Sequence, residues 1–411
     1  MNPKISQRWR LAAAGIATAL TLTGVAACSQ GQDSATTASS TSSSSATPSS
    51  SKTSASSANT KLSAKTVTVT IGGQQMTLSG AYVVDGVDAT IDGGTYASLK
   101  ADQVVFLVVN GGHLTITNAT IEKSGTPADA ASDNYNFYGS NSAVLVVGEG
   151  SSVTMTNSTV NTTSAGSNAI FATASAKANV SGVKISTTAD SSRGLDATYA
   201  ATITAKNVDI HTLGAHCAAV ATDRGNGTVT VTGTNKMVTE GEGSPLIYST
   251  GKISVSGVTG SSKASEAVVV EGKNSASLTG STITSGGTNA VMLYQSFSGD
   301  AADPDSTSTS SSFAMSNTTL THTGSGAVIY ATNTTTTATL TNVTVKTSGA
   351  TAVQAKADRW GTSGSNGGKL TLTLNNTKLS GALADGSSTI TVTTASGGAL
   401  DGSKSGSVTV S

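Results

Sequence analysis

The sequence predicts an all-β fold over residues 65–411, a right-handed parallel β-helix of about a dozen coils. Alternating segments such as TVTVTI, LTITNATI and KLTLTL dominate the chain, which is typical of strands with one buried face. A landmark segment, TN-A-TI at 117–121, recurs in related forms with a base interval of 23–27 residues, and three longer intervals hold inserted loops. Almost no apolar stripe of helical length interrupts this pattern.

A second strand follows the landmark in each full coil, as in SAVLVV, RGLDAT, AAVATD and AVMLYQ. Each coil therefore holds about three short strands separated by turns. In such a solenoid the coils hydrogen-bond to one another, apolar residues stack inward, and Thr and Ser face outward. The landmark asparagines leave two interpretations open. Their side chains point inward and hydrogen-bond the neighbouring coils, or they are exposed turn residues with a left-handed backbone. These asparagines are Asn118, Asn157, Asn207, Asn317, Asn342 and Asn376.

Residues 1–27 are predicted to be a secretory signal peptide. Three basic residues precede an apolar run at 11–27, which is shorter than the roughly 20 residues needed to span a bilayer. VAAC at 25–28 resembles the bacterial lipobox, in which the cysteine is lipidated and becomes the first mature residue. The resemblance implies lipid on Cys28 and anchoring to the outer face of the cell membrane, with the folded part exposed on the cell surface.

Residues 28–64 are predicted to be the lipidated cysteine followed by a disordered linker. The segment is rich in Ser and Thr and has no aromatic residue, so it cannot bury enough surface to offset its chain entropy. Cys28 and Cys217 are the only cysteines. If Cys28 carries lipid, Cys217 has no partner and the fold holds together without a disulfide.

Charge and composition argue against several ligand classes. Without the signal peptide the chain has 20 basic and 23 acidic residues, so a nucleic-acid partner is not expected. No cofactor is expected either. The four histidines show no metal-ligand spacing on one coil, and a metal site is not predicted. The only calcium candidates are three acids in the loop GDAADPDST, namely Asp300, Asp303 and Asp305.

The segment HCAAVATDRG at 216–225 gathers side-chain types that catalyse reactions. It falls on a second strand, where His216 and Cys217 point to opposite faces and cannot form a catalytic pair. We predict that Cys217 is a buried filler and His216 a turn residue, which leaves Asp223 and Arg224 as contact candidates. A polysaccharide lyase or hydrolase would need clustered or paired carboxylates, and the strand ends offer one acid per coil at most. Catalysis is therefore not expected, and a polysaccharide-degrading enzyme is kept as the alternative.

Aromatic and charged side chains follow the second strands along one edge of the predicted rod. Aromatic rings can stack on the CH faces of sugars while polar groups contact hydroxyls, so this edge predicts non-catalytic binding of an extended ligand, first of all a polysaccharide. A second interpretation is that the rings only cap the core. A third is a spacer or a protein-binding adhesin. The candidate contact residues are Tyr199, Asp223, Arg224, Tyr248, Glu271, Lys273, Tyr294, Gln295, Arg359 and Trp360.

Several segments are similar to those of uncharacterised bacterial surface lipoproteins that have the pectate-lyase-like β-helix superfold, some of them labelled adhesin-like. These segments are SSRGLDATY, HCAAVATDRG, SPLIYSTG, VVEGKN and MLYQSFSGD. The resemblance covers roughly residues 66–411. It implies the fold and the location but no reaction, because fold alone does not determine function.

Overall fold

A computed structural model describes residues 59–296, 310–360 and 367–411, which belong to one compact unit, Asn59–Ser411. Cys28, the signal peptide and most of the linker lie outside the described residues. The calcium candidates Asp300, Asp303 and Asp305 lie outside them as well.

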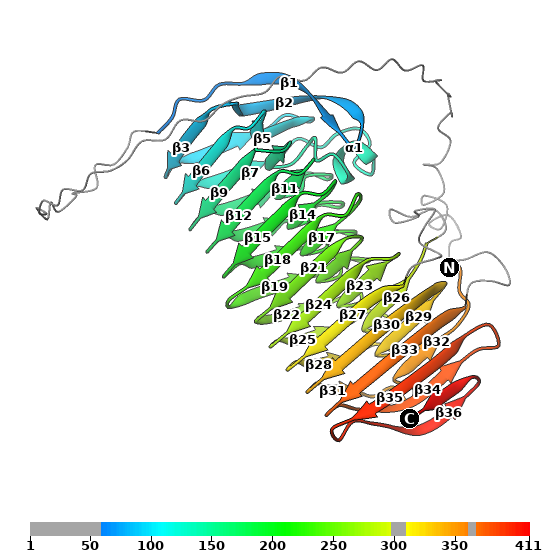
Figure 1. Cartoon of the computed structure of the whole chain (residues 1–411). Helices are drawn as coiled ribbons and strands as arrows, with labels where there is room; N and C mark the ends of the chain where they lie inside the picture. Colours follow the sequence, from blue (N-terminus) through cyan, green and yellow to red (C-terminus); the bar gives the residue numbers. More distant parts are fainter. Residues whose placement is uncertain (1–58, 297–309, 361–366) are drawn as a thin grey trace, which may run out of the picture. The chain divides into compact units, whose positions relative to one another are not determined.

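The unit is a right-handed parallel β-helix of about twelve coils, which confirms the predicted fold (Figure 1). Three sheets run its length, here called A, B and C, with 14, 13 and 10 strands. Successive coils contribute neighbouring strands to each sheet, and all pairings are parallel except that of the first two strands of sheet A. The predicted three strands per coil therefore correspond to the three sheets.

The strands of sheet A are, in spatial order, β1 (Lys65–Ile71), β2 (Gln74–Asp85), β5 (Gln103–Val109), β8 (Val144–Val147), β11 (Ile170–Thr173), β14 (Leu195–Ala197), β17 (Val220–Thr222), β20 (Ile247–Ser249), β23 (Val268–Glu271), β26 (Val291–Tyr294), β29 (Ile329–Thr332), β32 (Val353–Ala355), β34 (Lys378–Ala384) and β36 (Ala399–Ser405).

The strands of sheet B are β3 (Asp88–Asp92), β6 (His113–Thr117), β9 (Ser152–Thr156), β12 (Lys177–Ser181), β15 (Thr202–Lys206), β18 (Thr228–Thr232), β21 (Lys252–Ser256), β24 (Ser275–Thr279), β27 (Ser311–Ser316), β30 (Thr334–Thr341), β33 (Gly368–Asn375), β35 (Thr389–Ala395) and β37 (Val408–Val410).

The strands of sheet C are β4 (Thr95–Ser98), β7 (Thr120–Lys123), β10 (Thr159–Thr162), β13 (Lys184–Thr187), β16 (Asp209–Thr212), β19 (Asn235–Thr239), β22 (Val258–Ser262), β25 (Thr282–Ser285), β28 (Thr319–His322) and β31 (Thr344–Thr347). The helix α1 (Asp133–Asn136) lies in the loop between β7 and β8.

The landmark asparagines lie outside the core, at the turn that follows a strand of sheet B; the next strand belongs to sheet C, or to sheet A in the case of Asn376. Each has a positive φ between 45° and 55°, and each is exposed. Only a short polar side chain or glycine adopts this left-handed conformation readily. The exposed-turn interpretation is therefore confirmed. Some of these side chains still bond across coils on the outside, as where Asn342 Nδ2 donates to Asn317 Oδ1 at 3.0 Å.

Cys217 is fully buried and His216 lies in a turn with φ of 58°, as predicted. Cys217 takes the place that serine holds in the adjacent coils: the Ser192 amide donates to Cys217 Sγ at 3.0 Å, and the Cys217 amide donates to Ser244 Oγ at 2.9 Å. Burial raises the pKa of the Cys217 thiol to about 11, so the thiol is protonated and unreactive. It forms no disulfide.

The first two strands fold over the outer face of sheet A. β1 pairs antiparallel with β2, and its Val67 and Ile71 join a second apolar cluster with Leu145 and Phe171 of that outer face. Residues 59–64, which the sequence analysis placed in the linker, reach the first coil: the Thr60 amide donates to the Thr90 carbonyl at 2.8 Å. This segment and the hairpin cover the first coils.

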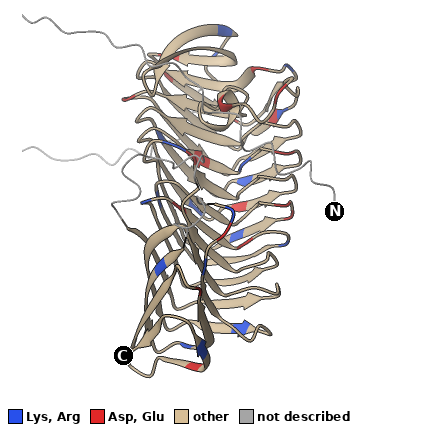
Figure 2. Cartoon of the chain, turned by 90° about the vertical axis from the view of Figure 1, so that its right-hand side faces the viewer, with Lys and Arg blue, Asp and Glu red and all other residues tan. Residues whose placement is uncertain are grey.

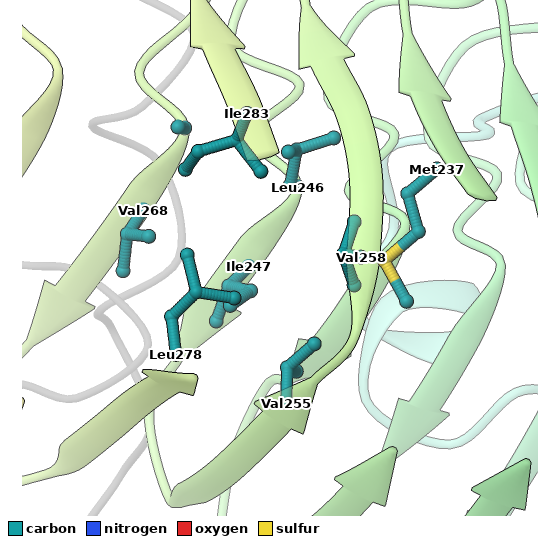
Figure 3. A pocket seen from close by; sticks show the side chains of 9 residues that line it. Met237, Leu246, Ile247, Val255, Val258, Val268, Leu278 and Ile283 are labelled. Atoms are coloured by element: carbon teal, nitrogen blue, oxygen red, sulfur yellow. The ribbon is translucent and has the colours of Figure 1, made fainter. Parts of the chain in front are cut away.

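One glycine interrupts the inward apolar row of sheet C. Gly260 of β22 lies between Met237 of β19 and Ile283 of β25, where other coils carry Ile, Val, Leu or Met. Met237 and Ile283 close the gap together with residues of sheets A and B, and the space among them has no room for a water molecule (Figure 3). The interior is therefore dry and close-packed at this coil.

Candidate functional site

The predicted contact residues lie on the outer face of sheet A and in the turns that follow its strands. Tyr248, Val269, Met292 and Tyr330 occupy one register position in four successive coils, so their side chains stack along the solenoid. Glu271 and Tyr294 are paired two residues further along the strands, on the same face. Unusually for an outward face, most of these strands are buried on both sides.

The N-terminal part of this face is covered by the loop that contains α1. Tyr199 stacks on Tyr138 of that loop with ring centroids 5.7 Å apart, and the Arg224 guanidinium lies 3.9 Å from the Phe137 ring centroid. A Cβ on Gly72, at the tip of the β1–β2 hairpin, would come within 2.2 Å of the Tyr199 ring. Tyr199 and Arg224 are therefore half-buried between the hairpin, the loop and the sheet.

A buried charged cluster lies in the same two coils, at β14 and β17. Arg193 Nε lies 2.7 Å from Asp223 Oδ2 and 3.7 Å from Asp196 Oδ2, and both aspartates are fully buried. Arg193 also donates to Asn136 Oδ1 of α1 at 2.8 Å. Burial raises the pKa of Asp223 well above its ordinary range; Arg193 opposes this rise and Asp196 adds to it. The two carboxyls therefore share one guanidinium, and Asp223 tends to hold a proton.

Glu271 is the centre of a second polar group on this face. Its Oε2 accepts hydrogen bonds from the hydroxyls of Tyr248 and Tyr294 at 2.5 and 2.7 Å, and its Oε1 accepts one from Ser296. Gln295 donates to the Ser296 carbonyl at 2.8 Å. The carboxylate is thus held by neutral donors from two coils.

The C-terminal part of the face is aromatic. Trp360 packs against Tyr294 with ring centroids 4.8 Å apart, and Tyr330 donates to Asp358 Oδ2 at 2.5 Å. Together with Val269, Met292 and Tyr248 these rings form an apolar cluster outside the solenoid core. Arg359 lies over the Trp360 ring at 4.7 Å.

Burial divides the ten predicted contact residues. Asp223, Glu271, Tyr294 and Gln295 are buried and make contacts within the face. The other six are at least partly accessible: Tyr199, Arg224, Tyr248, Lys273, Arg359 and Trp360.

The acids of this face were judged from the sequence to be isolated, one per coil. The structure instead brings Asp196 and Asp223 together around Arg193, with Glu271 further along the same face. A signal was present in the sequence: near-continuous apolar runs such as VVVE and VMLY are typical of strands buried on both faces. Polar residues in such strands are therefore buried as well.

Across residues 59–296, 310–360 and 367–411, no group of three or more His, Cys, Asp or Glu side chains is arranged to hold a metal ion. In the same ranges no helix has the length and apolar character needed to cross a bilayer.

Comparison with known proteins adds no family. No family model matches the chain, and no curated protein matches it. The resemblance to bacterial surface lipoproteins is therefore supported in the fold alone, a parallel β-solenoid with three parallel sheets.

Proposed function

We propose that this chain is an exported, lipid-anchored cell-surface β-helix that binds an extended polysaccharide without catalysis. The observation that carries the proposal is the aromatic cluster on the outer face of sheet A, which is separate from the core and ends in the partly accessible rings of Tyr248 and Trp360. Exposed apolar groups rimmed by polar residues are typical of binding sites, and these two rings are the accessible part of the cluster.

The shape of this face suits a polymer. Tyr248 and Tyr330 occupy the same register position three coils apart, with Val269 and Met292 between them, so this row of side chains runs along the solenoid axis over about 14 Å. Tyr and Trp offer large, rigid contact surfaces whose ordering costs little conformational entropy. Lys273 and Arg359, at the ends of the strands, supply hydrogen-bond donors for sugar oxygens.

Retention on immobilised polysaccharides tests the proposal. The chain from residue 29 onward, which contains the whole compact unit, is passed over plant, mucin and microbial polysaccharides. Retention on at least one of them, with no new sugar ends in the eluate, is the expected result. Absence of retention on every polymer would contradict glycan binding and favour a spacer or a protein-binding adhesin.

A polysaccharide-degrading enzyme is the second candidate, and one observation favours it. Asp196, Asp223 and Glu271 lie on one face, and glycoside hydrolysis uses paired carboxyls, one of them with a raised pKa. Their burial and their bonds to Arg193, Tyr248 and Tyr294 argue for a structural role. New reducing or unsaturated ends in the same assay would establish the enzyme.

A further inference from the structure

We propose that the polysaccharide bound along the outer face of sheet A is anionic and carries carboxylate or sulfate groups. This inference rests on the proposed glycan binding. It concerns which chemical class of glycan the face selects.

Three cations on this face lie over aromatic rings. The Arg224 guanidinium is 3.9 Å from the Phe137 centroid, the Lys356 ammonium 5.6 Å from that of Tyr330, and the Arg359 guanidinium 4.7 Å from that of Trp360. A ring holds a cation by its quadrupole and leaves the far side of the cation open. A sugar at such a position can contact the ring edge with its CH groups and the cation with an acidic substituent.

These three cations have no carboxylate partner in the described part of the chain. The ion pairs found there all lie elsewhere: Lys65–Asp85, Arg193 with Asp196 and Asp223, and Glu240 with His211 and Lys263. Asp358 and Asp385 lie near Lys356 and Arg359 but bond backbone amides and the Tyr330 hydroxyl, so none of the three cations forms a direct ion pair with a carboxylate among the described residues.

The acidic side chains of the same face form hydrogen bonds or ion pairs with groups of the protein itself. Glu271 accepts from two tyrosines and a serine, and Asp223 is paired with Arg193. Asp358 accepts from the Tyr330 hydroxyl and from the Arg359 amide at 2.6 Å. Glu271 and Asp223 are thus buried and bonded within the face, whereas Arg224, Lys356 and Arg359 are at least partly accessible.

The spacing of the cations fits a chain molecule. Arg224 follows β17 and Arg359 follows β32, with β20, β23, β26 and β29 between them, so five coil steps separate the two. At about 4.8 Å per step the distance is about 24 Å. This is a length over which a polymer with repeated acidic groups meets several cations, and a single small anion does not.

The net charge of the whole chain does not oppose this inference. Lys and Arg together equal Asp and Glu in number, and both signs of charge are interspersed on the side of the solenoid that faces the viewer in Figure 2. Exposed charges separated by more than about 8 Å are largely screened at physiological ionic strength. The charged groups that lie close to a bound polymer therefore matter more for its recognition than the net charge of the chain.

Matched polymer pairs test the inference. The chain from residue 29 onward is titrated with hyaluronan and alginate and with their methyl esters, and with chondroitin sulfate and its desulfated form. We expect at least one acidic polymer to bind at least tenfold more tightly than its neutral or desulfated partner. We expect its affinity to fall as salt rises from about 0.05 M to about 0.5 M. The ester pairs identify carboxylate recognition and the sulfate pair identifies sulfate recognition.

Substitutions test which cationic side chains bind the acidic groups of the polymer. Lys356→Gln and Arg359→Gln should each weaken binding of that acidic polymer by about tenfold and leave binding of its neutral partner unchanged. Lys369→Gln is the matched control, since Lys369 is exposed on the outer side of β33 in sheet B and should have no effect. Thermal unfolding of each variant shows that the fold is intact.

The outcomes separate this inference from the proposed function. Three results would show that the face does not select anionic glycans, while glycan binding itself would stand. These are equal binding of acidic and neutral partners, retention of neutral polymers only, and equal effects of Lys369→Gln and Arg359→Gln. No binding of any polymer in the panel or in these pairs would overturn the glycan proposal itself.

Discussion

Asp223 shows how far burial changes the role of a single residue. The sequence presents it as a charged group in a surface turn, whereas the structure places it fully inside, against Arg193 and close to Asp196. Removing a carboxylate from water is costly unless it is paired or protonated, and here both conditions contribute. Its partner Arg193 also bonds α1, so this cluster fastens the α1 loop to the solenoid.

The raised pKa of Asp223 predicts a pH dependence of stability. Its folded-state pKa lies above the unfolded value of about 3.9, so proton binding favours the folded state at low pH. This contribution is lost as the pH rises through the folded-state pKa. Asp223→Asn mimics the protonated form, so its melting temperature minus that of the unmodified chain should increase between pH 4 and pH 8.

Thermal unfolding across this pH range checks the prediction. Asp88→Asn is the control, because Asp88 is exposed on β3 and its replacement should give a constant difference. A difference for Asp223→Asn that does not change with pH would show that Asp223 is already ionised in the folded protein.

Trp360 is the residue with the largest predicted effect on ligand binding. Its ring is partly accessible and rests on Tyr294, and buried aromatic anchors contribute most of the energy at many interfaces. Trp360→Ala should weaken binding of a retained polysaccharide by about 30-fold, equivalent to about 2 kcal/mol. Leu99→Ala, at a residue that is 76% exposed on another part of the chain, should leave the affinity unchanged. Equal affinities of all three chains would exclude Trp360 from the site.

At the scale of strands and turns, the sequence was sufficient for the repeat itself. The landmark period and the second-strand segments correspond to the three sheets, because alternation and turn chemistry act within a few residues. The covering of sheet A could not be predicted in this way. It depends on contacts such as Tyr138 with Gln74 and Arg193 with Asn136, between residues more than fifty positions apart.

The same limit applies to the candidate site. Aromatic and charged residues at the strand ends were found from their positions in the repeat. Which of them are buried depends on the β1–β2 hairpin and on the loop around α1, and the repeat pattern does not contain that information. The apolar runs of β23 and β26 were the one local signal that this face is covered.

Gly260 offers a test of packing within one coil. A Cβ at this position would lie 2.4 Å from the Met237 carbonyl oxygen, too close for the neighbouring strand to accept without moving. Gly260→Ala should therefore lower the free energy of unfolding by about 1–3 kcal/mol, the usual cost of overpacking. Gly386→Ala is the matched control, because no atom lies within 4 Å of the added Cβ. Equal unfolding midpoints in urea would contradict the close packing of β22.

At the scale of the whole molecule, export and lipid anchoring remain predictions. Cys28 lies outside the described residues, and the case for its lipidation is the VAAC segment after the apolar run. In a bacterial host that lipidates exported proteins, label from radioactive palmitate should appear on the chain and vanish in Cys28→Ala. Cys217→Ser should keep the label. The fold should accept this substitution because serine occupies the equivalent place in the adjacent coils. Label that persists in Cys28→Ala would overturn the lipobox interpretation.

The molecule combines a dry, uniform core with one specialised outer face. Sheets B and C present mainly Thr, Ser, Asn and Lys to solvent, as an exposed β-solenoid surface requires. Sheet A alone carries a second layer of aromatic and charged side chains on its outside. This asymmetry is the basis for placing ligand binding on sheet A.

Titration of Trp360 fluorescence with a retained polysaccharide tests that placement most directly. Trp9 and Trp360 are the only tryptophans, so in the chain from residue 29 onward the signal comes from Trp360 alone. We expect a saturable change in emission with the same dissociation constant as retention on the polymer. Retention with unchanged emission would place the glycan elsewhere on the molecule and contradict the assignment of the outer face of sheet A.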